Sequence, residues 1–426
     1  MLKQRKLYMA VFVAVTVLFS YIQENRIGHF KNTINIDGIG YYAWLPATFL
    51  YKGDYNWQFK DSVISKLPAY QNRVQFFTYP NEQGKEVNKY SCGLAIVALP
   101  FWSVASAGTK IFYGNVNGFE TPFQVAMWFN NLFWLLLGLL VFLNLLNTLG
   151  FSLKQQLAMA IMLVFGTNLF HFITFDNTLT HPANLGLCLL FISALYRFTI
   201  QNQQKWLLIA CFAGFAVFLL RPINIILLFI LLFPFLTGNS HFRLLQPKSL
   251  LTALLFVFLT LLVYTFSLHL QTGKWVYYSF GPERFNFTKT HFWELFIGYR
   301  CGLFLYTPAA LFFFWFLLKS NLKGFQKIGL VLFIAAVNYL FSAWIDHCFG
   351  CRVGNRPMVD YFSVMLLPLL FVKPEKLVFR FRLLWLLPLF CLFYNQVLHY
   401  QYRHYLIDWC YMNKDKFWSS FLRLKR

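Results

Sequence analysis

The sequence predicts an all-α protein, a polytopic bundle of transmembrane helices. Of its 426 residues 58% are hydrophobic and only 12% are charged, with a mean hydropathy of +0.52. Soluble domains carry roughly a quarter charged residues, so this composition indicates many membrane spans. The net charge is +22, but the cations lie in short clusters between apolar runs. That pattern is typical of cytoplasmic loops and argues against nucleic acid as a partner.

Charge placement also predicts the topology. Lys3, Arg5 and Lys6 precede a first span at about 7–22, which no small-residue cleavage site follows, so we expect it to be retained. The stretch 91–113 is long enough to cross, but crossing would put most later basic turns outside. We therefore predict that it lies on the outer face as a juxtamembrane or re-entrant helix, and expect about eleven spans in all. The remaining spans are predicted at 123–148, 156–172, 183–200, 206–220, 222–237, 250–269, 302–318, 328–345, 359–372 and 383–397.

This topology divides the chain into a transmembrane domain, residues 1–397, and a short external tail, residues 398–426. Within the domain, residues 23–121 form a large outer loop with juxtamembrane helices. Unusual ionisable residues fall at the outer ends of spans or in outer loops, where charges beside hydrocarbon are costly and tend to mark function. They are Asp37, Lys89, Asp176, His181, Arg221, Arg300, Asp346, Arg352 and Arg356. Their position predicts a single site on the extracytoplasmic side.

Asp37 begins the segment around which this site is expected. Two glycines follow it, and then an aromatic-rich helix that includes Tyr41 and Tyr42 and suits the headgroup layer. The carboxylate could act as a general base, or it could only cap the helix N-terminus, as Asp commonly does.

The other candidate residues each have a structural alternative. Lys89 and Tyr90 could anchor a phosphate or be interfacial residues at the start of an apolar helix. Asp176 and His181 could hold an acceptor sugar or cap the helix that Pro182 begins. Arg221, between two apolar runs, could bind a lipid phosphate or extend to the membrane surface.

Two outer loops combine glycine with arginine. They contain Arg300 in one case and Arg352 with Arg356 in the other, and both could make bidentate phosphate contacts. The eight cysteines are scattered and do not predict a disulfide framework. His347, Cys348 and Cys351 resemble part of a zinc site, but without a second ligand pair a disulfide or two free thiols is favoured. No nucleotide-binding glycine motif is present, so a soluble nucleotide substrate has no support.

In the order of these motifs the chain resembles the GT-C class of integral-membrane glycosyltransferases, such as the protein O-mannosyltransferases and the lipid A aminoarabinose transferase. The likeness runs from the first span to about residue 370 and rests on the Asp37 segment ending in Gly53-Asp54, on Lys89-Tyr90, and on Gly354-x-Arg356. Asp176 with His181, and Arg221, are similar in place to the family's polar outer loop and phosphate-binding basic residue. The family often has two adjacent acidic residues in the first loop, whereas Gly38 follows Asp37, so Asp54, Glu86 or Asp176 could share its role.

The resemblance implies an inverting glycosyltransferase in a bacterial inner membrane. It would move a sugar from a polyprenyl-phosphate donor to a glycan, lipid or protein acceptor on the extracytoplasmic face, with Asp37 as catalytic base. No cofactor is required by this scheme; a divalent metal ion, if used, is expected at Asp37 with Asp176. Two other functions stay open: a flippase or transporter for lipid-linked sugars, which predicts ionisable residues near the bilayer midplane, and a non-catalytic assembly protein of the same fold.

Overall fold

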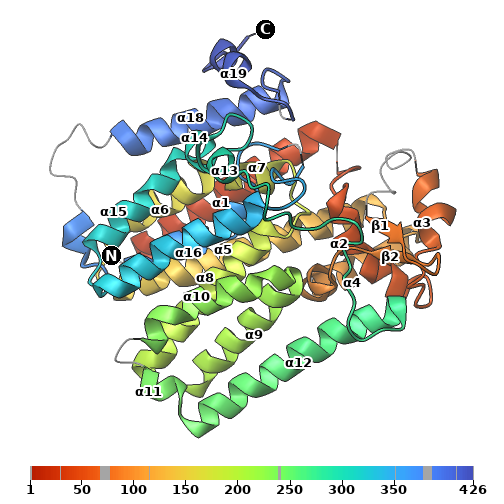
Figure 1. Cartoon of the computed structure of the whole chain (residues 1–426), viewed down its shortest axis with the longest axis horizontal. Coiled ribbons are helices and arrows are strands. Elements are labelled where there is room, and N and C mark those ends of the chain that lie inside the picture. The colour runs from red at the N-terminus through yellow and green to blue at the C-terminus, as the bar shows by residue number, and fades with distance from the viewer. Residues whose placement is uncertain are drawn as a thin grey trace.

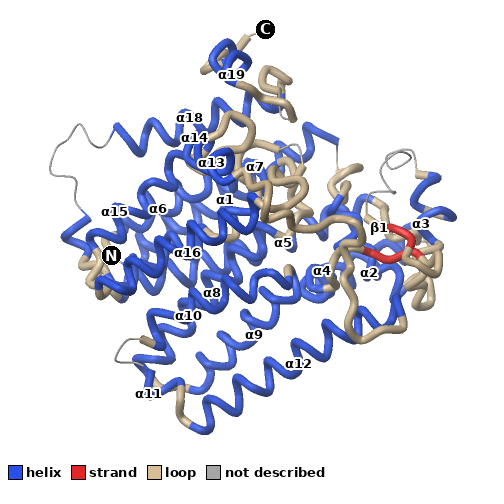
Figure 2. The backbone as a smooth tube through the Cα atoms, in the orientation of Figure 1, coloured by secondary structure: helices blue, strands red, loops and turns tan. Residues whose placement is uncertain are grey.

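The computed structural model describes residues 2–28, 30–67, 77–114, 116–237, 241–350, 352–377, 386–408 and 410–425. Over these residues the chain is almost entirely helical, and strand occurs only in one short antiparallel hairpin, β1 (Thr78–Pro80) with β2 (Glu86–Asn88) (Figure 2). This confirms an all-α protein of the membrane type. Six described helices are long and apolar enough to cross a bilayer, by length and composition. The count of eleven spans and the GT-C architecture stay predictions.

The long helices run roughly side by side (Figure 1). The six of spanning length are α1 (Leu2–Gly28), α4 (Gly93–Tyr113), α5 (Thr121–Thr148), α8 (His181–Gln201), α12 (Pro247–Thr272) and α16 (Gly324–Ser342). Shorter apolar helices lie between them: α6 (Leu153–Phe165), α9 (Gln204–Leu220), α10 (Ile225–Leu236), α15 (Phe312–Lys319) and α18 (Leu386–Arg403). Four of these begin within three residues of a span that the sequence predicted, whereas α15 begins ten residues into the predicted span 302–318, whose first part forms short helical turns.

Short elements fill the connections. They are α2 (Asp37–Phe49), α3 (Phe59–Ser62), η1 (Ile64–Lys66), α7 (Leu169–Thr174), η3 (Pro222–Asn224), α11 (His241–Leu244), α13 (Phe292–Ile297), α14 (Leu303–Tyr306), η4 (Pro308–Leu311), η5 (Pro357–Val359), α17 (Phe362–Leu366), η6 (Leu367–Phe371), η7 (Pro374–Leu377) and α19 (Lys414–Ser420). Most of these lie at the ends of the long helices, where the chain carries its polar residues. The predicted span at 359–372 is a series of such turns rather than one regular helix.

Helix α8 is the centre of the bundle and packs against both α5 and α9. Its contact with α5 is a backbone approach: a Cβ added to Gly186 would come within 2.1 Å of the Trp134 carbonyl oxygen, so only glycine fits there. By contrast, α12 lies along the outside of the bundle beside α9 and exposes a continuous apolar surface (Figure 1). Exposed leucines and phenylalanines over such a length suit contact with lipid rather than water.

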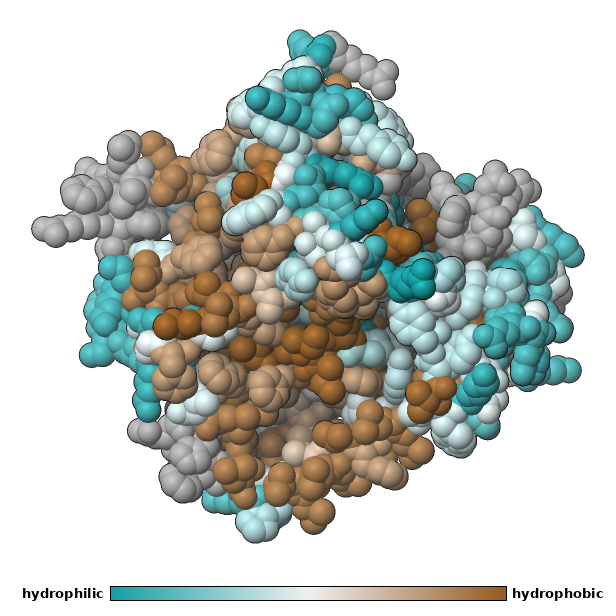
Figure 3. Space-filling model, in the orientation of Figure 1, coloured by the Kyte–Doolittle hydropathy of each residue, from teal (hydrophilic) through white to brown (hydrophobic). Residues whose placement is uncertain are grey.

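The surface in Figure 3 has an apolar middle and polar ends, as expected for a bundle of membrane helices. Hydrophobic residues cover the middle of this face, over the long helices, and hydrophilic residues gather at the end that carries α3 and the hairpin, and around the C-terminal tail. A polar region beyond an apolar belt is the expected distribution for a membrane protein.

Helix α4 is long enough to span a membrane, and its two flanks contact α2 and the turn that follows α2. Just before it, the backbone carbonyl of Tyr90 accepts a hydrogen bond of 3.0 Å from Trp44 Nε1; just after it, the carbonyl of Asn117 accepts one of 2.9 Å from the Tyr51 hydroxyl. The two flanks of α4 thus contact α2 on one side and Tyr51, two residues after the end of α2, on the other. That 91–113 lies on the outer face without crossing stays a prediction.

Candidate active site

A cluster of buried charges forms where several helices end on the same side of the bundle as α2. Asp37 is the first residue of α2, His181 is the first residue of α8, and Arg221 directly follows α9. Arg356 immediately precedes η5, and Asp360 lies between η5 and α17. These five residues, which are far apart in the sequence, form one continuous hydrogen-bonded chain. We call them the charged cluster.

The first link of the charged cluster is the ion pair between Asp37 and Arg356. Arg356 Nη2 donates to Asp37 Oδ2 at 2.6 Å, and the side chains are only 12% and 19% exposed for Arg356 and Asp37. Burial alone would raise the pKa of Asp37, but the guanidinium of Arg356 and the hydroxyl of Tyr90, which both donate to it, keep that pKa below its ordinary value. The carboxylate is therefore ionised and already bound to a cation.

Arg356 is held from three directions. Besides Asp37, its Nη1 donates to the Phe349 carbonyl at 3.0 Å and its Nε donates to His181 Nε2 at 3.1 Å. The loop before it requires glycine at 354, where φ is +68° and an added Cβ would come within 2.8 Å of Tyr306 Cβ. The guanidinium thus has a defined position in a loop of irregular backbone.

Asp360 joins the two arginines through His181. Its side chain is completely buried; Oδ1 lies 2.8 Å from His181 Nδ1, and Oδ2 accepts from Arg221 Nη1 at 2.7 Å. Because a guanidinium can only donate, His181 Nε2 must accept from Arg356, which leaves the ring proton on Nδ1 to be donated to Asp360. The 3.4 Å approach of Arg221 to Nδ1 is then a contact between two donors rather than a hydrogen bond.

Arg221 differs from Arg356 because part of its guanidinium has no hydrogen-bond acceptor among the described residues. Its Nη1 donates to the Asp360 carboxylate, and among the residues that the structure describes no acceptor is bonded to Nε or Nη2. The side chain is 15% exposed. A guanidinium fixed on one side by a buried carboxylate, with donors left on the other, can accept a further anion.

A second buried group lies next to the charged cluster. Asp176 forms an ion pair with Arg352 and lies 2.9 Å from His171 Nε2. Burial acts to raise its pKa, but Arg352, His171 and the more distant Arg356 together lower it well below the ordinary value. Arg352 likewise lowers the pKa of Asp37. The two groups therefore share one electrostatic field, in which every carboxylate has a cation.

Of the two tyrosines predicted to lie near Asp37, Tyr41 lies in the site and Tyr42 lies in the core. Tyr41 packs on Tyr90 with ring centroids 4.6 Å apart, and its hydroxyl bonds to Thr180 beside His181. Tyr42 points away: its hydroxyl donates to the Gly118 carbonyl and accepts from Trp102 Nε1 at 3.0 Å. Tyr41 and Tyr90 line the Asp37 side of the charged cluster, whereas Tyr42 joins α2 to the chain before α5.

Two predicted cations lie outside the charged cluster. Lys89 forms an ion pair of 2.6 Å with Glu283, in the connection between α12 and α13. Arg300 donates to the Cys410 carbonyl at 2.8 Å and lies 3.7 Å from Asp346. The acidic residues considered as partners of Asp37 are also separate, since Asp54 accepts from the Phe59 amide at 2.8 Å and Glu86 pairs with Lys60 at 3.2 Å.

The sequence analysis missed Asp360, His171 and Glu283. Asp360 is the most important omission, because it joins Arg221 to His181. A signal was present: Asp360 is the carboxylate in the otherwise apolar run of η5, α17 and η6, and an ionisable residue in such a run is a functional indicator by the rule applied to the others.

The expectation for the cysteines was wrong in one respect. Cys301 and Cys348 form a disulfide with an S–S distance of 2.10 Å, and Cys410 is disulfide-bonded as well, while Cys92, Cys188, Cys211 and Cys391 are free. Cys351 lies outside the described residues. Among the described residues, one group of three potential metal ligands lies close together: Cys301, His347 and Cys348. Two of them, Cys301 and Cys348, are already bonded to each other in the disulfide. Asp37 and Asp176, the pair considered for a divalent ion, are each ion-paired with an arginine, Arg356 and Arg352 respectively.

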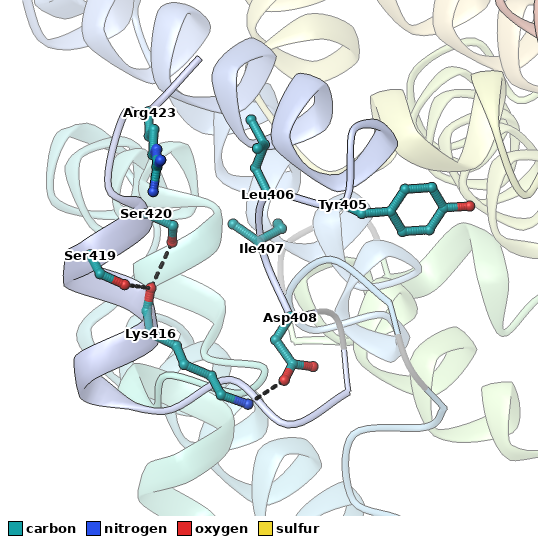
Figure 4. Close-up of a pocket in the computed structure, with 8 residues that line it drawn as sticks. All are labelled: Tyr405, Leu406, Ile407, Asp408, Lys416, Ser419, Ser420 and Arg423. Carbon is teal, nitrogen blue, oxygen red and sulfur yellow. Dashed lines mark hydrogen bonds and ion pairs between the residues drawn. The ribbon is translucent and has the colours of Figure 1, made fainter. Parts of the chain in front are cut away.

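The C-terminal tail contains a different kind of hollow, of about 410 Å³, lined by residues of the α18–α19 connection and α19 (Figure 4). Its ion pair, Lys416 with Asp408, has side chains that are 49% and 31% exposed. The hydroxyls of Ser419 and Ser420 donate to the Lys416 carbonyl within the helix. No buried charge faces this hollow among the described residues that line it, so it offers little for catalysis.

Comparisons with protein families, with curated protein sequences and with solved structures found no match. The fold and the site define the class: an all-α, multi-pass membrane protein with a buried cluster of paired charges at the ends of its helices.

Proposed function

We propose that the chain is an inverting glycosyltransferase of the inner membrane, which takes a sugar from a polyprenyl-phosphate donor on the extracytoplasmic face. The observation that carries this proposal is the charged cluster itself: an ionised carboxylate, Asp37, is joined to two arginines, of which Arg221 keeps unused donors. A base and an anion receptor in one partly buried site are what transfer from a sugar phosphate requires. The order of motifs along the chain supports the GT-C assignment.

In the reaction, the acceptor hydroxyl oxygen attacks the anomeric carbon from the face opposite the phosphate. Its proton passes to the Asp37 carboxylate. The bond between the anomeric carbon and the phosphate oxygen breaks, and its electron pair goes to that oxygen, so a phosphodiester becomes a phosphomonoester with one more negative charge. Arg221 and Arg356 would stabilise this charge in a site shielded from water.

The ion pair of Asp37 with Arg356 implies that the donor binds before the acceptor. A carboxylate that is bound to a guanidinium at 2.6 Å, with its pKa lowered, is a weak base. Donor phosphate beside Arg221 offers Arg356 a second anion, and transfer of Arg356 from Asp37 to the phosphate would raise the pKa of Asp37 and free its oxygen for the acceptor. Donor binding would thus activate the base before the acceptor arrives.

The disulfide supports the extracytoplasmic side. Structural disulfides persist in oxidising compartments such as the bacterial periplasm. Cys348 lies a few residues before Arg352 and Arg356, and its disulfide with Cys301 ties their loop to the segment after α13. The loop that carries two arginines of the site is therefore the part of the chain expected to be outside.

The position of the charged cluster favours an enzyme over a transporter. A transporter for lipid-linked sugars predicts ionisable groups near the bilayer midplane, in interrupted helices. Here Asp37 and His181 begin helices, and Arg221 follows the last residue of one.

The direct test is a transfer assay. Membranes with the chain would be incubated with a panel of radiolabelled polyprenyl-phosphate hexoses, for the wild type and for Asp37→Asn. Loss of a general base is expected to reduce transfer by about 10²–10⁴-fold. Asp61→Asn, the same change at an exposed residue of α3, is the control and is expected to leave transfer within about twofold. Undiminished transfer by Asp37→Asn at equal expression would remove Asp37 from the mechanism.

A further inference from the structure

A cavity of about 330 Å³ lies within the helical bundle, apart from the charged cluster. Its walls come from α6, the η4–α15 segment and α17, with Leu377 and Pro388 at one end. They are almost wholly apolar, among them Met159, Met162, Phe313, Trp315, Phe362 and Met365. A cavity of this size is at the lower limit for small-molecule pockets, which are roughly 300–1,000 Å³. Its lining suits an alkyl chain, since it offers water few hydrogen-bond partners.

Polar side chains occur at the end of this cavity where α6 begins. Lys154 and Gln155 line it there, and Gln155 Nε2 donates to the Pro374 carbonyl at 3.0 Å. Lys376 in turn donates to Asn321 Oδ1 at 3.2 Å, which brings the chain after α15 to the same place. Around this mouth Lys154, Lys319, Lys373 and Lys376 are exposed, and Glu375 is the neighbouring carboxylate on these segments.

This mouth lies at the same end of the bundle as the N-terminus. Arg5 Nε donates to Gln156 Oε1 at 3.3 Å, one residue after Gln155. In Figure 1 the N-terminus lies at the same end of the bundle as the turn from α15 to α16. Cations around the N-terminus and these turns make this the end expected in the cytoplasm.

We propose that the cavity binds one acyl chain of an anionic phospholipid from the leaflet that faces the N-terminus, with the lipid phosphate against Lys154. The apolar walls accept the chain because its methylenes fill the space between the helices and make close dispersion contacts there. The excess of lysines selects a negatively charged headgroup, as basic pockets between helices on this side of a membrane do. Cationic charge at the mouth and apolar walls behind it together favour an anionic lipid over a neutral one.

This site is independent of the proposed glycosyl transfer. The bound chain would fill the space against Phe362 and Met365, which belong to the helix after Asp360. Occupation therefore would support the packing of α17, which follows the residue that binds Arg221 and His181.

Trp315 in the cavity wall provides the test. The full-length protein would be reconstituted in phosphatidylcholine vesicles that contain a rising fraction of a lipid with brominated acyl chains. The brominated lipid is phosphatidylglycerol in one series and phosphatidylcholine in the other. Subtraction of the Trp315→Phe variant isolates the fluorescence of Trp315. We expect brominated phosphatidylglycerol to quench this component at a mole fraction at least threefold lower than brominated phosphatidylcholine.

Variants separate headgroup from chain. Lys154→Glu is expected to remove the preference for phosphatidylglycerol, and Lys248→Glu, the same change at an exposed lysine at the start of α12, is expected to keep it. Ala310→Phe fills the cavity and is expected to remove the Trp315 component with both lipids. Equal quenching by the two lipids in the wild type, or no quenching of Trp315, would overturn the proposal. Relief of quenching by added polyprenyl phosphate would also overturn it, because the cavity would then belong to the donor.

Discussion

Two pairs of an aspartate with a basic side chain lie in very different surroundings. Asp37 with Arg356 is 19% and 12% exposed and belongs to a chain of hydrogen bonds that continues to His181 and Asp360. Asp408 with Lys416 in the tail is 31% and 49% exposed and involves only its own loop and helix (Figure 4). The first pair had to be removed from water before it could form, whereas the second remains largely hydrated.

The difference teaches where function is expected. An exposed pair contributes about 0–1 kcal/mol, because solvent screens it and the long side chains lose freedom. A buried pair is costly to form, and removal of one partner leaves an uncompensated charge. A chain therefore keeps buried, linked charges only where they are needed. The charged cluster meets that description, and the tail pair does not.

The largest expected effect concerns Asp360, whose two oxygens hold His181 and Arg221. Asp360→Ala leaves Arg221 buried without its counter-ion and is expected to lower the free energy of unfolding by about 3–5 kcal/mol. Asp408→Ala is expected to lower it by no more than about 1 kcal/mol. Denaturation of the two purified variants in detergent measures both values. Equal losses would mean that the two ion pairs do not differ in the way their burial indicates.

The next effect separates two arginines that the sequence did not distinguish. Arg221→Gln removes the unused donors of the charged cluster, and the affinity for polyprenyl phosphate is expected to fall at least tenfold, since charge-assisted hydrogen bonds contribute about 1.5–3 kcal/mol each. Arg300→Gln removes a cation already bound to a backbone carbonyl and is expected to change the affinity by less than about threefold. A larger loss for Arg300→Gln than for Arg221→Gln would contradict the site.

The smallest effect is a pH dependence. The pKa of Asp37 is lowered in the folded protein, so its ionised form contributes stability that is fully present above its ordinary pKa of 3.8 and is lost as the pH falls through the lowered value. The difference in melting temperature between the wild type and Asp37→Asn is thus expected to shrink as the pH is lowered from neutral into the acid range below that ordinary value. A difference that grows in acid would have the wrong sign.

The fold and part of the site were predictable from sequence. Apolar length and the placement of cations predict helices and sides, and charges at helix ends led to Asp37, His181, Arg221 and Arg356, which the structure brings together. Partner choice was not predictable. Asp37 and Arg356 are 319 residues apart in the sequence. The partners of Lys89 and Arg300 lie in the loop after α12 and in the C-terminal tail, and they depend on how those segments fold back onto the bundle. The disulfide joins cysteines 47 residues apart, a spacing with no sequence signature.

The most direct measurement is the affinity of the purified protein for polyprenyl monophosphate, compared between the wild type and Asp37→Asn. If Arg356 is shared between Asp37 and the donor phosphate, removal of the competing carboxylate charge must tighten phosphate binding, by about tenfold, even though the same variant loses transfer. Weaker or unchanged binding by Asp37→Asn would contradict that exchange, and with it the claim that the charged cluster receives a lipid-borne phosphate.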